Sequence, residues 1–398
     1  MILAGVSLSF VFNGGILDKS QQAVNEYQNA ANNESEILEY IDSTLEQKIN
    51  EINSGSGAGG GTGDTPTVDS NGLADKDTTI VAVDDEDVQI VIPKGFAPAI
   101  LETGRTDSSP EENGTVEKIM PAEDWNNITA EQINKGIVVV DNAITYTNGS
   151  GYPLIIPDFN EYVWIPIIDE SKFARIAWNT PNTGEHILSE EKPEDGFWED
   201  KTTQEYRDMV DSVIKNKGFY ISRYEASKKD SITAQSKSGQ IPWGNEPYST
   251  FITASNNMKP SIHSHLIYGI EWDSILQWFL DSRAIVIGAK WTGTSYEYEI
   301  DIMSREYIES QSYGFGNYEG GFYNTGVKEE YKVNNIYDLA GNLEEVTQEK
   351  IVTILENIPI TKQVSRGGNY KDKSPIAERT ATSTNNNNYC GFRVAFYV

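Results

Sequence analysis

Cysteine, histidine and basic side chains are scarce in this chain of 398 residues. The one cysteine, Cys390, excludes a disulfide within the chain and a zinc site built from four thiolates. Three histidines leave little material for zinc ligation or for histidine-based catalysis. Lysine and arginine total 31 against 60 acidic residues, so the net charge is -29. That field repels phosphate backbones, which argues against nucleic acid as a partner.

A long apolar run is also missing at the N-terminus. Residues 2–12 are almost wholly apolar, but a membrane span needs about 20 such residues. A stripe of isoleucine and leucine between 37 and 52 then predicts an amphipathic helix. Residues 1–30 resemble the second half of the N-terminal helix of type IV pilin-like proteins of Gram-positive bacteria. The resemblance implies a truncated anchor over 1–53, a place on the cell surface or pilus, and other pilin subunits as partners.

The rest of the chain divides by composition. Residues 54–77 are rich in glycine, serine and threonine and predict a flexible linker. A small β-rich region is expected over 78–151, with strands at 79–83, 88–92, 137–140 and 144–147. Residues 152–398 predict a second domain with strands at 162–168 and 218–224, a helix at 271–280 and much irregular loop. The predicted class is therefore α+β.

Four motifs occur in a fixed order in the second domain: 219–225 (FYISRYE), 272–278 (WDSILQW), 335–345 (NIYDLAGNLEE) and a final pair at 366–370 (RGGNY) and 391–394 (GFRV). Together they resemble the formylglycine-generating and sulfatase-modifying family. The resemblance covers about 152–398 and implies a C-type lectin-like fold. The planar guanidinium groups of Arg366 and Arg393 can donate paired hydrogen bonds to carboxylates or carbonyls. A structural role is expected for both arginines.

The same resemblance implies a calcium site on the 335–345 loop. Its carboxylates would come from Asp338 and Glu345, and its carbonyls from Gly341 and Leu343. Calcium takes six to eight hard oxygen ligands of this kind. The alternative is a loop closed by side-chain hydrogen bonds without a metal. No organic cofactor is expected.

Catalysis is not expected, although family enzymes use a copper-binding cysteine pair. The corresponding positions are occupied by Pro375 and Thr380. Cys390 is expected to be a small side chain buried in the core. His263 and His265 would share one face of a strand, but no third metal ligand is near them in the sequence.

The C-terminal region, about 366–398, carries a polar stretch rich in asparagine and threonine between two motifs expected to be buried. Tyrosine supplies rigid amphipathic contact area, and asparagine and serine supply adaptable hydrogen bonds. The pattern resembles the variable proteins of diversity-generating retroelements. The resemblance implies ligand contacts at Asn369, Tyr370, Lys371, Asp372, Thr382, Ser383, Asn385, Asn386, Asn387, Asn388 and Tyr389. Pro375, Ile376, Ala377 and Arg379 would be scaffold.

These observations predict a surface-displayed, non-catalytic protein whose C-terminal region binds a protein or a glycan. Two alternatives remain open, a formylglycine-generating oxidase and a structural minor pilin. The absent cysteine pair argues against the first. Replacing 385–388 with alanine would separate binding from a purely structural role.

Overall fold

The computed structural model describes residues 65–101, 115–142, 158–176, 178, 197–291, 296–310, 321–328, 331–355, 358–371, 374–382 and 388–398. All of them belong to one unit of the chain, Gly61–Val398. The predicted N-terminal helix over 1–53, the first part of the linker and the predicted strand at 144–147 lie outside the described residues.

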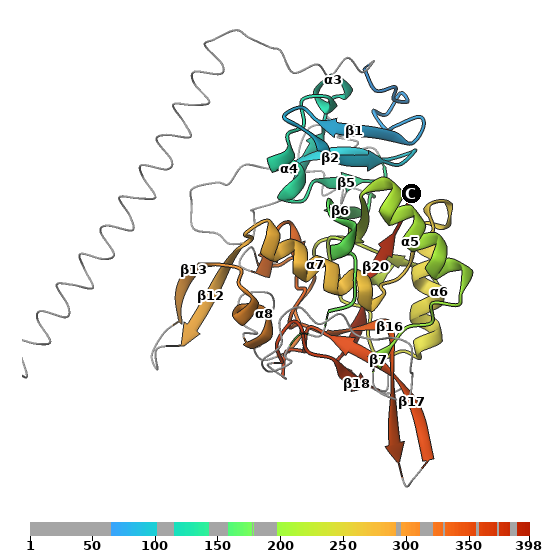
Figure 1. The fold of residues 1–398 in the computed structure, drawn as a ribbon, viewed down its shortest axis with the longest axis vertical. Coiled ribbons are helices and arrows are strands. Elements are labelled where there is room, and N and C mark those ends of the chain that lie inside the picture. The colour runs from blue at the N-terminus through green and yellow to red at the C-terminus, as the bar shows by residue number, and fades with distance from the viewer. Residues whose placement is uncertain are drawn as a thin grey trace, which may run out of the picture. The chain divides into compact units, whose positions relative to one another are not determined.

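Seven antiparallel strands form the central sheet (Figure 1). In spatial order they are β11 (His265–Leu266), β20 (Val394–Phe396), β8 (Gly218–Ser222), β6 (Glu161–Pro166), β5 (Val138–Val140), β3 (Ala97–Leu101) and β4 (Val116–Ile119). The predicted strands at 137–140, 162–168 and 218–224 are confirmed as β5, β6 and β8 with slightly different ends. The C-terminal strand β20 lies inside this sheet, between β11 and β8.

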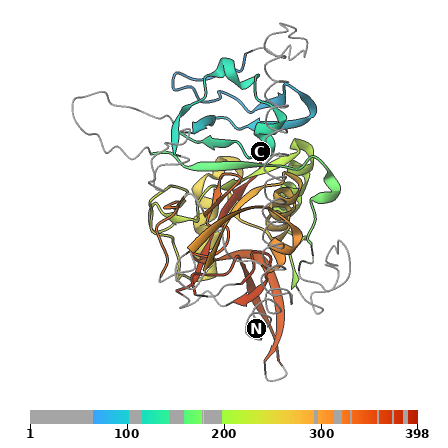
Figure 2. The ribbon, with the colours of Figure 1, turned by 90° about the vertical axis from the view of Figure 1, so that its left-hand side faces the viewer.

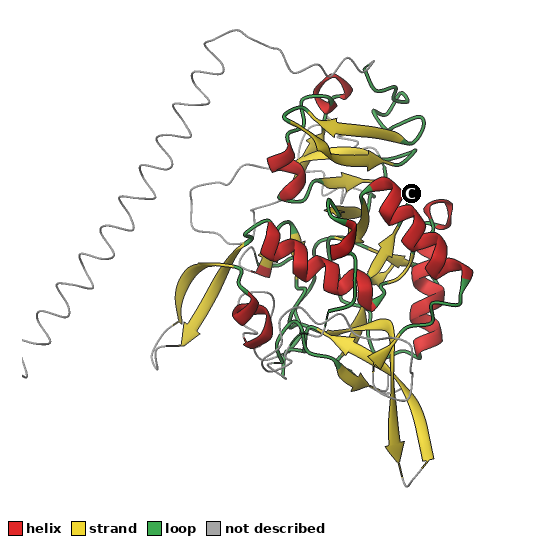
Figure 3. Cartoon of the chain, viewed as in Figure 1, coloured by secondary structure: helices red, strands yellow, loops and turns green. Residues whose placement is uncertain are grey.

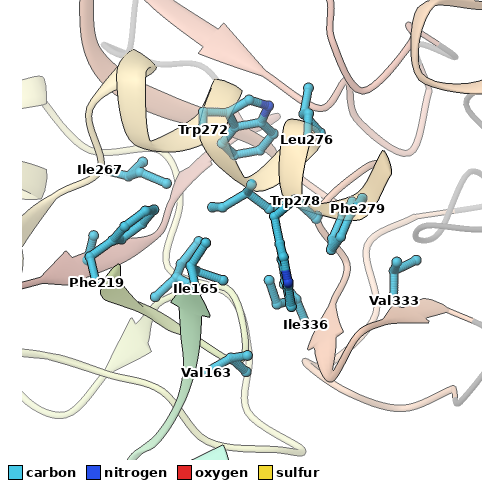
Figure 4. Close-up of a cluster of buried hydrophobic side chains, with 14 of the residues drawn as sticks. Val163, Ile165, Phe219, Ile267, Trp272, Leu276, Trp278, Phe279, Val333 and Ile336 are labelled. Carbon is cyan, nitrogen blue, oxygen red and sulfur yellow. The ribbon is translucent and has the colours of Figure 1, made fainter. Parts of the chain in front are cut away.

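Both faces of the central strands are covered, because β6 and β8 are buried at every position. Alternate side chains of a strand point to opposite faces. One face packs against helix α7 (Gly269–Asp281) through Val163, Ile165, Phe219 and Ile221 (Figure 4). The other face packs against the hairpin of β1 (Thr78–Ala82) and β2 (Asp85–Ile92) through Tyr162, Trp164 and Tyr220.

Helix α7 confirms the predicted helix at 271–280. Its predicted apolar face is fully buried, and the neighbouring Asp273 and Glu271 are buried as well. The other helices are α3 (Ala122–Trp125), α4 (Ala130–Asn134), α5 (Gln204–Asn216), α6 (Tyr248–Met258) and α8 (Arg305–Ser310), with 3-10 turns η2 (Glu170–Lys172) and η4 (Pro260–Ile262). Short hairpins are formed by β9 (Ser227–Lys228) with β10 (Ala234–Gln235), β12 (Ile285–Trp291) with β13 (Tyr296–Ile302), and β14 (Lys332–Val333) with β15 (Ile336–Tyr337).

A second sheet is built around one long hairpin, β16 (Glu344–Leu355) and β17 (Ile358–Arg366). Strand β18 (Thr380–Thr382) pairs with β17, while β7 (Phe197–Trp198) and β19 (Cys390–Phe392) pair with β16. Figure 2 shows this hairpin at the end of the described unit opposite β1 and β2. Because β19 is followed directly by β20, the last strands of the chain connect the two sheets.

The structure joins the two regions that the sequence analysis separated at residue 151. Strands β3, β4 and β5 come from the predicted β-rich region, yet they continue the sheet that contains β6, β8 and β20. Phe96 packs against Phe396 with ring centroids 5.6 Å apart, so the two regions share a core. Helices lie outside sheets of mostly antiparallel strands, which confirms the α+β class (Figure 3).

Candidate ligand-binding surface

The structure describes only part of the predicted contact set. Six of these residues are placed: Asn369, Tyr370, Lys371, Thr382, Asn388 and Tyr389. Five others lie outside the described residues: Asp372, Ser383, Asn385, Asn386 and Asn387. The geometry of the surface is therefore built from the placed residues and their neighbours.

Two of the predicted contacts are buried, which corrects the expectation that they face a ligand. Asn369 is 6% exposed, and its Oδ1 accepts a hydrogen bond from the backbone N–H of Lys371 at 3.0 Å. Thr382 is also 6% exposed, and its Oγ1 lies 3.3 Å from an oxygen of Glu344 and 3.2 Å from the sulfur of Cys390. Short polar side chains readily form hydrogen bonds with nearby backbone and buried groups. Both residues therefore stabilise the buried part of the C-terminal region, which we call the frame.

Tyr370, Lys371 and Tyr389 come together on the surface. The Lys371 ammonium donates a hydrogen bond to the Tyr389 hydroxyl at 2.6 Å and lies 4.8 Å from the centre of the Tyr389 ring. The rings of Tyr370 and Tyr389 are 5.4 Å apart and inclined by 58°. We call the polar stretch 369–389 the tail. The contact between Lys371 and Tyr389 joins its two ends, which therefore lie side by side.

A second segment, which the sequence pattern did not predict, joins these tyrosines. Phe322 packs against Tyr370 at 6.3 Å between ring centroids. Phe322 and the adjacent Tyr323 are 45% and 39% exposed, which is unusual for such large side chains. We call Phe322, Tyr323, Tyr370 and Tyr389 the aromatic patch. A detectable signal was present, because two neighbouring aromatic residues follow Gly320 and Gly321 without any strand or helix periodicity.

Buried charges hold the base of the tail. The ion-pair network consists of three arginines and three carboxylates: Arg175, Glu199, Asp273, Glu349, Arg366 and Arg379. Arg366 donates to Asp273 at 2.8 Å and to Glu349 at 3.3 Å, and Arg379 bonds to the same two carboxylates. The formal charges balance, which a buried network requires. The predicted structural role of Arg366 is supported by these contacts.

The network also sets the protonation of its acids. Burial acts to raise the pKa of Asp273, but the guanidinium groups of Arg379 and Arg366 outweigh it and hold the pKa below its usual value. Burial raises the pKa of Glu199 to about 7 despite the opposing charge of Arg175. Glu199 accepts hydrogen bonds from the N–H groups of Gly269 and Ile270, at the N-terminus of α7. A carboxylate is favourable there because these groups lack partners within the helix.

The loop predicted to bind calcium is closed by protein groups. Both oxygens of Glu345 accept hydrogen bonds from Arg393, at 2.9 and 3.0 Å from its Nε. The backbone N–H of Leu343 donates to Glu225 at 2.9 Å, and that of Gly341 donates to the carbonyl of Gly367 at 2.8 Å. Arg393 thus already supplies a positive charge to Glu345.

Asp338 accepts a hydrogen bond from the N–H of Gly326 at 3.3 Å, and burial raises its pKa to about 7. Among the residues that the structure describes, no three carboxylate, imidazole or thiol side chains are grouped to hold a metal. In the structure these carboxylates bind Arg393 and backbone N–H groups, and calcium binding stays a prediction. Glu225, a buried member of this loop's contacts, was not foreseen.

The histidine pair and the cysteine are separate from the surface. His263 has a left-handed φ of 54° after η4, and only His265 belongs to β11, so the prediction that both lie on one strand face is wrong. The His265 ring lies 3.0 Å from a buried oxygen of Glu271. Cys390 is fully buried, and its sulfur lies 2.8 Å from Glu344.

In the described part of the chain, no helix combines the length and apolarity needed to cross a bilayer. No protein-family model matches the sequence, and no curated protein does. Among solved structures, the chain is similar to the protein described as Treponema denticola variable protein 1. The identity is 15%, the TM-score is 0.22, and the match covers 66% of this chain and 95% of that one. A TM-score this low establishes neither fold nor function.

Proposed function

We propose that the chain is a ligand-binding protein whose C-terminal region, about 366–398, recognises a protein or glycan target. The observation that carries the proposal is the aromatic patch, in which half-buried Tyr370 and Tyr389 lie beside exposed Phe322 and Tyr323. Tyrosine gives large contact areas while losing little conformational freedom, and it is enriched where proteins recognise ligands. The 385–388 run, of which the structure describes Asn388, would add further contacts.

The frame beneath the tail supports this function. Ile376 and Ala377 are buried, and Arg366 and Arg379 bind Asp273 and Glu349 on other elements. A surface held by a rigid frame loses less conformational freedom on association than a flexible one. Changes among exposed residues would therefore alter recognition while the frame persists.

The remaining parts of the proposal rest on the resemblances found in the sequence. The frame would be a C-type lectin-like domain of the formylglycine-generating type, used by a diversity-generating retroelement variable protein for binding and without catalysis. Residues 1–53 would attach it to the surface or pilus of a Gram-positive bacterium and would contact other pilin subunits. Many copies on one appendage would add avidity.

The test uses two defined probe sets, a phage-displayed library of random dodecapeptides and an array of immobilised glycans. The full chain is compared with a variant in which 385–388 are alanine and with Tyr389→Ala. We expect the probes bound by the unmodified chain to bind each variant at least about tenfold more weakly, about 1.4 kcal/mol, with thermal unfolding nearly unchanged.

Val81→Ala is the matched control, since Val81 is 45% exposed on the β1 strand and lies outside the tail. It should bind every probe as the unmodified chain does. If no probe distinguishes the tail variants from this control, the proposed function is wrong and the structural alternative gains support.

A further inference from the structure

We propose that the loop 321–328 forms a second half of the recognition surface, and that its partner is a protein surface presenting a carboxylate beside an apolar side chain. The inference rests on the proposed function, because it takes the tail as the first half. It assigns binding to Phe322 and Tyr323, which lie well before the tail in the sequence and have no counterpart in the predicted contact set.

The loop is fixed to the frame by its backbone. The Tyr323 N–H donates to the side-chain oxygen of Asn342 at 2.7 Å, and the Asn342 amide donates back to the Tyr323 carbonyl at 3.2 Å. Thr325 is fully buried, and it exchanges hydrogen bonds with Gln240 at 2.8 and 3.1 Å. The backbone is therefore held while the side chains of Phe322 and Tyr323 face solvent.

A glycine supports this placement. Gly326 has a φ of 65°, in the left-handed region that glycine adopts without strain. A Cβ at this position would run into the ring of Tyr224. Because Gly326 packs closely against Tyr224, the end of the loop is held against the buried frame. The exposed rings of Phe322 and Tyr323 are therefore attached to an immobilised backbone.

The loop and the tail form one continuous surface. Phe322 contacts Tyr370, and Tyr370 contacts Tyr389, at 6.3 and 5.4 Å between ring centroids. The Tyr370 N–H also donates to the carbonyl of Asn342 at 3.0 Å. Asn342 thus holds both halves, since its side chain binds Tyr323 and its carbonyl binds Tyr370.

The ring geometry favours a protein partner over a sugar. A sugar ring stacks best on a flat and open aromatic face, and the Lys328 ammonium lies 5.6 Å from the centre of the Tyr323 ring. Neighbouring rings are inclined by 61° and 58°, so they offer edges and hydroxyl groups and form no flat platform.

Lys371 indicates the chemistry of the partner. This exposed side chain places an ammonium group at the patch of a protein whose net charge is -29. An ammonium beside an aromatic ring provides a partner for a carboxylate, and the ring provides apolar contact next to it. An acidic side chain flanked by an aliphatic or aromatic one meets both requirements.

The experiment selects the random dodecapeptide phage library on the full chain. Selected peptides are then measured against Phe322→Ser, Tyr323→Ser, Lys371→Met and Tyr389→Ala, with Val81→Ser as the control. We expect selected sequences to contain Asp or Glu next to an apolar residue. Phe322→Ser and Tyr389→Ala should each weaken binding at least about tenfold, and Lys371→Met should remove the preference for the acidic residue. Thermal unfolding verifies that each variant is folded.

Three results would overturn the inference. Selected peptides that lose binding to Tyr389→Ala but bind Phe322→Ser and Tyr323→Ser normally would restrict recognition to the tail and leave the proposed function standing. A chain that selects no peptide but binds the glycan array through the patch would exclude a protein partner. A chain that binds neither probe set would overturn the inference together with the proposed function.

Discussion

Arg366 and Tyr370 are four positions apart in the chain, yet they belong to opposite kinds of environment. Arg366 is 1% exposed and binds two buried carboxylates, whereas Tyr370 packs in a surface patch with Phe322 and Tyr389. Breaking a buried ion pair costs several kcal/mol, while most exposed substitutions cost less than about 0.5 kcal/mol. Within a few residues, this region thus separates side chains that hold the fold from side chains that are available for contact.

Arg366→Met should have the largest effect on stability. The substitution removes a positive charge that pairs with Asp273 and Glu349 in a buried site. We therefore expect a loss of about 3–5 kcal/mol in the free energy of unfolding. Denaturant titration measures it. Arg207→Met, on the exposed surface of α5, is the control and should cost less than about 1 kcal/mol. A loss below 1 kcal/mol at Arg366 would show that the network does not hold the tail.

Glu199 should make the stability of the buried network depend on pH. Its folded pKa is about 7, above the ordinary value of 4.5, because burial disfavours the charged form. The unfolded chain therefore releases this proton first as pH rises, and stability falls between about pH 4.5 and 7, by up to about 3 kcal/mol.

Glu199→Gln should make that part of the stability profile less steep, measured by denaturant unfolding from pH 4.5 to 8, and Asp338, whose pKa is also raised to about 7, accounts for slope that remains. The exposed Glu123→Gln should leave the slope unchanged. A Glu199→Gln profile parallel to that of the unmodified protein would contradict the assignment.

Asn342→Gly tests the link between the two environments. Glycine keeps the left-handed φ of 55° but removes the amide that binds Glu225 and Tyr323. Leaving buried partners without this amide should cost about 1–3 kcal/mol. It should also weaken patch-dependent peptide binding. Asn245→Gly, another asparagine with positive φ at 61°, controls for the backbone effect; equal losses in both variants would argue against the link.

Tyr389→Phe has the smallest expected effect. It removes the hydroxyl that accepts the Lys371 hydrogen bond and that raises the pKa of this lysine. The contact lies at an exposed site, so the free energy of unfolding should change by less than about 0.5 kcal/mol. A loss above 1 kcal/mol in a denaturant titration would place the patch among the structural elements.

The sequence predicted elements whose evidence is local. Strands β6 and β8 and helix α7 were foreseen because apolar residues recur with the right period. The insertion of β20 between β11 and β8, and the continuation of the sheet into β5 and β3, depend on pairing between distant segments. No short window of sequence carries that information.

The site was foreseen only in part for a related reason. Polar composition predicted exposure for the whole tail, but Asn369 and Thr382 are buried because nearby backbone, carboxylate and thiol groups provide hydrogen-bond partners. Phe322 and Tyr323 were missed because their surface location depends on contacts with Asn342 and Tyr370.

The calcium prediction can be examined separately by following thermal unfolding with added calcium and with a chelator.

The position of β20 has a consequence for how altered tails would be tolerated. Val394–Phe396 form an inner strand of the main sheet, between β11 and β8, and they are translated after the polar stretch 369–389. A premature stop or a shifted reading frame within the tail removes that strand and leaves β8 and β11 without a shared neighbour. An in-frame change keeps β20. Truncated or frame-shifted chains lack this strand, so misfolding and degradation would remove them before they reached any target.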